Sequence, residues 1–179
     1  ILGYSVGSSG GVFTIGVGEG SSSTDGADIV LTSSAGAIDA TALSAGDDIL
    51  LTAANSIAVN GATTLGLGTT DGDSSVRTQG GATTLGNVDA FSDVVVDAAG
   101  AATLDGPVAA GRDVMINAAS VSLVMLSNPS GPVDTLTADG NIVINSATDI
   151  TGGGTQALGS AALTAGTTID VTHVGGGTE

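Results

Sequence analysis

The segment Leu43-Ser-Ala-Gly-Asp-Asp-Ile-Leu-Leu-Thr-Ala53 decides the fold class of this chain. A turn-forming run, Ala-Gly-Asp-Asp, separates the opening leucine from Ile49, and an aliphatic residue recurs two positions later at Leu51. Apolar residues at every second position are the periodicity of a β-strand, which places one face inside and the other outside. The segment therefore predicts a short strand, a tight turn and a second short strand.

Copies of this template recur along the chain. Close copies begin at Val108, Leu136 and Leu163, and weaker copies begin at residues 23, 70 and 88. Successive copies start 18 to 28 residues apart. The seventh template position is always Ile or Val: Ile29, Ile49, Val76, Val94, Val114, Ile142 and Ile169. Two residues later an aliphatic residue recurs in Leu31, Leu51, Val96, Ile116, Ile144 and Val171, with Thr78 as the exception.

Most copies contain two further short strands. One lies around Ile38, Ile57, Val121 and Ile150, and the other includes the template's opening residue, as in Leu43. Three short strands in about 20 residues, separated by Gly, Asn and Asp turns, describe one coil of a parallel β-helix. Short strands cannot bury their own apolar faces, but coils stacked about 4.8 Å apart bury one another's.

We therefore predict an all-β chain that forms a right-handed parallel β-helix, or β-solenoid, with about seven coils of roughly 20 to 28 residues. Residues 23–179 are the repeat segment, and residues 1–22 are an atypical N-terminal coil or junction. The longer spacings predict a loop of about seven extra residues at one corner. A β-sandwich is the rival fold, but it does not explain why one template recurs at nearly constant spacing.

Composition narrows the classes of function. Eighteen acidic residues oppose two arginines and no lysine, so the formal net charge of −16 excludes nucleic acid and anionic membrane as partners. The chain has no cysteine, which excludes disulfides and thiol catalysis. It begins at Ile1 without a start methionine or signal peptide, so we expect a fragment of a longer exported chain.

The template Leu-x-Ala-Gly-x-Asp-Ile-x-Leu-x-Ala of Leu43–Ala53 and Val108–Ala118 resembles the haemagglutinin-type repeat. That repeat is typical of filamentous haemagglutinin-like exoproteins, and the resemblance covers about residues 23–174. It implies two-partner secretion through an outer-membrane pore, an extracellular location on the cell surface, and a role as an adhesin or in biofilm. We expect this fragment to lie outside the family's amino-terminal secretion domain, and we interpret Asn128-Pro-Ser-Gly131 as a plain turn.

Few residues suggest catalysis, and we expect no enzyme, no catalytic residue and no cofactor. The only histidine, His173, is expected to be an exposed end-coil residue. One template position carries carboxylates beside the buried aliphatic column, and Arg112 adjoins it. Asp and Asn often cap turns through their side chains, so a structural ladder is the preferred interpretation. Its members are Asp28, Asp48, Asp93, Asp113, Asn141 and Thr168.

Three other interpretations remain open. A carbohydrate-active β-helix enzyme could use Asp113 and Arg112. The carboxylate column could bind calcium, although the calcium-binding nonapeptide of β-helices is absent, and we assign no metal ligand. An ice-binding solenoid would present threonine ladders, but Gln79, Asp97, Asn117 and Asn145 interrupt the column of Thr32, Thr52 and Thr172.

The template copy at residues 70–87 is unusual, because it places Arg77 and Thr78 where other copies carry apolar or small residues. We expect Arg77 to point outward. Neither Ile1–Ser22 nor Val174–Glu179 has the sequence of a polar cap, and unpaired strand edges at the ends of a solenoid normally need one. We therefore expect flanking coils or copies of the chain to stack end to end, and we consider a host or surface glycan as a further partner.

Overall fold

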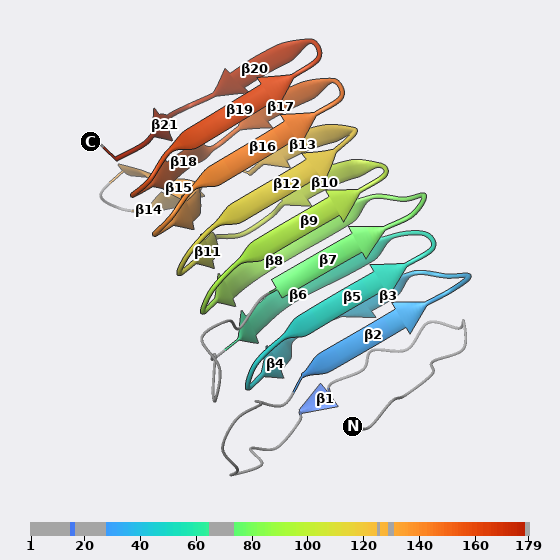
Figure 1. Cartoon of the computed structure of the whole chain (residues 1–179). Coiled ribbons are helices and arrows are strands. Elements are labelled where there is room, and N and C mark those ends of the chain that lie inside the picture. Colours follow the sequence, from blue (N-terminus) through green and yellow to red (C-terminus); the bar gives the residue numbers. More distant parts are fainter. Residues whose placement is uncertain (1–14, 17–27, 65–73, 125, 129–130, 178–179) are drawn as a thin grey trace.

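The structure is a computed structural model, and it describes residues 15–16, 28–64, 74–124, 126–128 and 131–177. The chain forms a right-handed parallel β-helix of about six turns, which confirms the predicted fold class (Figure 1). Most of the proposed junction at residues 1–22 lies outside the described residues. No helix long and apolar enough to cross a membrane occurs in the described ranges.

The first face of the solenoid is a seven-stranded parallel sheet. Each of its strands has five residues and carries the template's alternating pattern. In Figure 1 these strands lie across the front of the solenoid, stacked from blue to red. They are β2 (Ile29–Ser33), β5 (Ile49–Ala53), β7 (Ser74–Thr78), β9 (Val94–Ala98), β12 (Val114–Ala118), β16 (Ile142–Ser146) and β19 (Ala161–Ala165).

The second and third faces belong to one fourteen-stranded sheet, because two long strands run across both faces. These are β6 (Ile57–Thr64) and β8 (Thr83–Ala90). The second face also contains β3 (Ile38–Ala40), β10 (Ala101–Leu104), β13 (Ser120–Leu123), β17 (Asp149–Gly152) and β20 (Thr168–Val171). The third face also contains β1 (Ile15–Gly16), β4 (Leu43–Ala45), β11 (Val108–Ala110), β15 (Gly131–Ala138), β18 (Gly154–Ala157) and β21 (Val174–Gly175).

Strand pairing corrects the predicted alignment of two template copies. Ser74, not Val76, pairs with Ile49 and Val94, and Val76 takes the following column in place of Thr78. In the last coil, Ala161 and Leu163 continue the two aliphatic columns, whereas Ile169 and Val171 lie on the second face. The first positions of the seven strands are therefore residues 29, 49, 74, 94, 114, 142 and 161, which are spaced by 20, 25, 20, 20, 28 and 19 residues.

The core is a single stack of aliphatic side chains inside the solenoid. Leu85, Leu104 and Leu123 pair in register on successive coils, and each side chain is at most 1% exposed. Burial of each such side chain contributes about 1.5–3 kcal/mol. Ser74 places a polar side chain in the otherwise aliphatic first column. Its buried hydroxyl has no hydrogen-bond partner in the structure.

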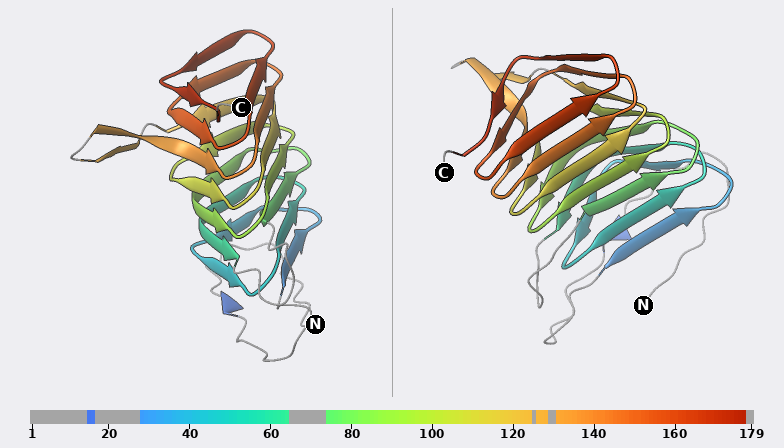
Figure 2. Two further views of the ribbon diagram at one scale, coloured as in Figure 1. Left: turned by 60° about the vertical axis from the view of Figure 1, so that its left-hand side comes forward. Right: turned by 45° about the horizontal axis from the view of Figure 1, so that its top comes forward.

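The two longer spacings arise at different corners, so the prediction of a loop at one corner was wrong. Residues 65–73 follow the third face and lie outside the described residues. The other insertion, between the second and third faces, is an antiparallel hairpin formed by β14 (Leu126–Asn128) and the start of β15. The hairpin projects sideways from the solenoid (Figure 2). Asn128 pairs with Gly131 where the sequence predicted a plain turn.

Candidate functional site

The predicted carboxylate column is a ladder that joins successive coils along the edge of the first face. The Asp28 Oδ1 atom accepts a hydrogen bond from the Asp48 backbone N–H at 3.3 Å, and the Asp93 Oδ1 atom accepts one from Asp113 at 3.0 Å. Asp113 Oδ1 in turn accepts from the backbone N–H of Asn141 at 2.6 Å. Each side chain thus caps the turn of the next coil. Asp and Asn side chains commonly cap their own turn instead.

The ladder ends differently from the prediction. Ser160 occupies the last rung, where its backbone N–H and its hydroxyl donate to Asn141 Oδ1 at 3.0 and 2.9 Å. Thr168, the predicted rung, pairs instead with Asp149 on the second face. The difference follows from the corrected alignment of the last coil. The ladder is therefore a structural device that fixes the spacing of neighbouring turns.

Arg112 forms an ion pair with Asp93, which lies one coil earlier. The Arg112 Nε atom donates to Asp93 Oδ1 at 2.7 Å, and Arg112 Nη2 donates to Asp93 Oδ2. This contact lowers the pKa of Asp93, burial opposes the shift by raising it, and the Asp113 N–H lowers it further. A lyase-like site would need Arg112 to face substrate, but here its guanidinium joins two coils.

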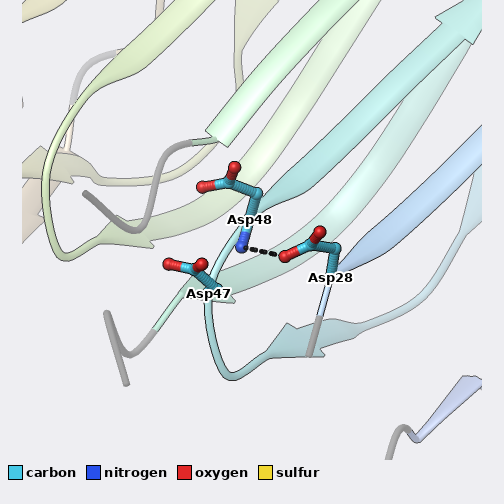
Figure 3. A group of neighbouring side chains, drawn as sticks. All are labelled: Asp28, Asp47 and Asp48. Atoms are coloured by element: carbon cyan, nitrogen blue, oxygen red, sulfur yellow. Dashed lines mark hydrogen bonds between the residues drawn. The ribbon is translucent and has the colours of Figure 1, made fainter. Parts of the chain in front are cut away.

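The structure brings a third carboxylate, Asp47, close to two rungs of the ladder. Carboxylate oxygens of Asp28, Asp47 and Asp48 all lie within 4.8 Å of one another (Figure 3). The Asp47 side chain is buried, with 6% of its surface exposed. Close carboxylates repel one another by about 1 kcal/mol per pair in water and more strongly when shielded.

These three side chains could supply part of the oxygen ligand set of a hard cation such as calcium. Calcium takes 6 to 8 oxygen ligands, so backbone carbonyls or water would have to complete the shell. The expectation from sequence was a possible calcium site along the whole Asp column. The geometry instead gathers carboxylates at one place, between the first two described coils.

A shallow surface hollow of about 730 Å³ lies over the third face. Two exposed apolar side chains border it, Phe91 at 53% and Leu158 at 66% exposure. Polar groups also line it, among them Asp89, Asp139 and Arg112. Asp113 is not among the lining residues, so the Asp113–Arg112 pair considered for a polysaccharide enzyme is not assembled in this hollow.

The other residues singled out from the sequence lie at the surface. His173 is exposed, as predicted, and its Nε2 atom lies 3.3 Å from Gln156 Oε1. Arg77 points outward, as predicted, and its Nε atom lies 3.5 Å from Asp97 Oδ2. The column considered for ice binding contains Arg77 and Thr164 in place of Gln79 and Thr172, so a positive charge interrupts it.

Comparisons of the chain with protein-family models, with curated proteins and with solved structures find no match. The arrangement of the described residues therefore carries the functional argument. Two features could not be read from the template, the position of Asp47 against Asp28 and the hollow beside Phe91. Asp47 was visible only as the first of two consecutive aspartates, a pattern that also occurs in ordinary turns.

Proposed function

We propose that this chain is a structural and adhesive segment of a large exported bacterial exoprotein that forms an extracellular rod or filament for surface attachment or biofilm. The observation that carries this proposal is the use of polar side chains along the ladder. Asp28, Asp93, Asp113 and Asn141 direct their oxygens to the next coil. Side chains used in this way join successive coils and support an extended solenoid.

The last described coil supports the proposed end-to-end partner. Ile169 is 48% exposed and Val174 is 46% exposed, although both stand in columns that are buried in earlier coils. Among the residues that the structure describes, no further strand pairs with the outer edges of β19, β20 and β21. A flanking coil or a second copy stacked on this end would bury both features.

The resemblance to haemagglutinin-type repeats supports export by the two-partner route and folding outside the cell. A chain without cysteine needs no oxidising step to become stable there, because the continuous core takes the place of disulfides. Glycans remain the class of surface ligand that we propose for attachment.

A polysaccharide lyase or hydrolase is the second candidate function. The hollow beside Phe91 favours it, because an exposed aromatic ring can stack on a sugar and carboxylates lie nearby. Against it, the Arg112 guanidinium already pairs with Asp93.

The experiment that tests the proposal measures binding and turnover on the same immobilised panel of neutral and acidic polysaccharides. The adhesive function predicts retention on at least one polysaccharide with no release of new reducing ends or unsaturated products. The Arg112→Gln and Asp113→Asn variants should then bind like the original chain. Product release that disappears in either variant would replace the adhesive proposal with the enzymatic one, and failure to bind any polysaccharide would refute glycan attachment.

A further inference from the structure

The outer surface of the seven-stranded sheet carries three columns of side chains that run along the solenoid axis. The first column is the ladder of acidic and amide residues described above. The third column is polar and includes Thr52, Arg77 and Asp97. Between them lies an aliphatic column, which we call the outer stripe: Val30, Leu50, Val95, Met115, Val143 and Ala162, with Ser75 in register between Leu50 and Val95.

The outer stripe is apolar although it faces away from the core. Val30, Leu50 and Met115 are 54%, 41% and 45% exposed, and Val95 and Val143 are half-buried. Single exposed aliphatic residues are normal on protein surfaces, but a row of them, interrupted here at Ser75, marks an interaction surface. The stripe repeats once per coil because template position eight is aliphatic in most copies. This regularity sets it apart from isolated residues such as Leu158.

The columns on either side of the stripe determine how a second copy can pack on it. The ladder side is acidic at Asp28, Asp48, Asp93 and Asp113. On the opposite side Arg77 and Asp97 pair with each other, so this column carries little net charge. Two copies related by a two-fold axis parallel to the solenoid axis place the acidic column of each against the polar column of the other. A two-fold axis along the strands would instead place the two acidic columns face to face.

The size of the face also fits a second copy. Seven strands at about 4.8 Å spacing and five residues at about 3.3 Å per residue give a face of roughly 550 Å² on each copy. The pair would bury about 1,100 Å², which is just above the ~1,000 Å² that a specific interface requires. Such an interface gives a weak, concentration-dependent dimer whose strength increases with the number of coils.

We propose that the outer stripe is a lateral self-association surface, through which two copies of this solenoid pack side by side with their axes parallel. Facing sheets would lie about 10 Å apart, as in other sheet-on-sheet packings, with the two stripes in contact between them. This interaction goes beyond the proposed rod and adhesive function, because it joins rods laterally and requires neither a glycan nor end-to-end stacking. The net charge of −16 on each copy opposes the association, so salt should strengthen it.

Because the chain has no cysteine, single-cysteine variants report the geometry directly. In the proposed dimer every stripe residue faces its own counterpart, so Leu50→Cys and Val143→Cys should each form cross-linked dimers with a short bis-maleimide. Leu158→Cys, which is exposed but lies on another face, should stay monomeric. Cross-linking that occurs only when the Leu50→Cys and Val143→Cys variants are mixed would indicate antiparallel packing and overturn the proposal.

Sedimentation velocity of the unlabelled chain provides the second measurement. The dimer fraction should rise with concentration and from about 0.05 M to about 0.5 M salt. Met115→Glu should weaken the association tenfold or more, because it would bury an unpaired carboxylate, and Leu158→Glu should not. Far-UV circular dichroism verifies that both variants are folded. A chain that stays monomeric at millimolar concentration and high salt, or that loses the dimer equally in both variants, would refute the lateral surface.

Discussion

Removal of one central core side chain tests how tightly successive coils pack. Leu104 is 0% exposed and lies in register between Leu85 and Leu123, which are each 1% exposed. Leu104→Ala removes three carbon atoms from this row, one methine and two methyl groups. Leu→Ala substitutions at fully buried positions cost 2.7–5.0 kcal/mol in the best-studied series, and the cost is highest where the surroundings cannot collapse. Hydrogen-bonded strands hold the backbone on both sides, so we expect a loss of about 3–5 kcal/mol.

The assay is urea unfolding followed by far-UV circular dichroism, with Thr103→Ala as the matched control. Thr103 is the preceding residue on the same strand, and its side chain points outward in a half-buried row. Its truncation should cost less than about 1 kcal/mol. A Leu104→Ala loss below about 1 kcal/mol, or an equal loss for both variants, would refute the assignment of Leu104 to a close-packed interior. Unequal slopes of the unfolding transitions would show that coils unfold separately, as in other repeat proteins.

Three further predictions concern the ladder and one turn. Asp113→Ala should lower the free energy of unfolding by about 1 kcal/mol, because the next rung's N–H loses its acceptor, whereas Asp113→Asn should be nearly neutral in urea unfolding. Arg112 lowers the pKa of Asp93, so this pair stabilises the fold above about pH 4. The stabilisation is lost as the pH falls through the lower pKa of the folded state. Acid titration of Arg112→Gln should therefore show a shallower loss of stability than that of the original chain. Gly152 has a φ of +109°, and an added Cβ would collide with the backbone oxygen of Leu123 on the neighbouring coil. Gly152→Ala should therefore lower the melting temperature by several degrees, and an unchanged melting temperature would contradict this conformation.

The fold class could be predicted from the sequence because the template states the same local preferences in every coil. Strand alternation, turn residues and spacing all pointed to one architecture. The alignment failed where the local pattern was ambiguous. In the third coil Ser74 and Val76 are two residues apart, so both fit inward-facing positions of a strand. The template assigned Val76 to the first column because serine is uncommon at core positions. Strand pairing decides between them, and pairing depends on the neighbouring coils.

The candidate site was only partly accessible from the sequence. The Asp column followed from the template, but the direction of its hydrogen bonds depends on side-chain geometry between coils that are 20 or 28 residues apart. The pairing of Arg112 with Asp93 has the same origin, since the two residues are 19 positions apart in the sequence and meet because their coils are stacked. The outer stripe corresponds to the eighth position of the template, but only the exposed fractions of its side chains showed that it forms an apolar surface.

The most direct test of the parallel solenoid is a methyl nuclear Overhauser measurement at Ile116. Its strand pairs in register with strands one coil before and one coil after, so its methyl groups should show contacts to Val96 and to Ile144, 20 and 28 residues away. Contacts to both residues, with equivalent pairs shifted in the same direction along the chain, are the expected result. If the residue numbers of the contact partners decreased as the sequence advanced along the strand, the strands would be antiparallel. The β-helix would then be wrong.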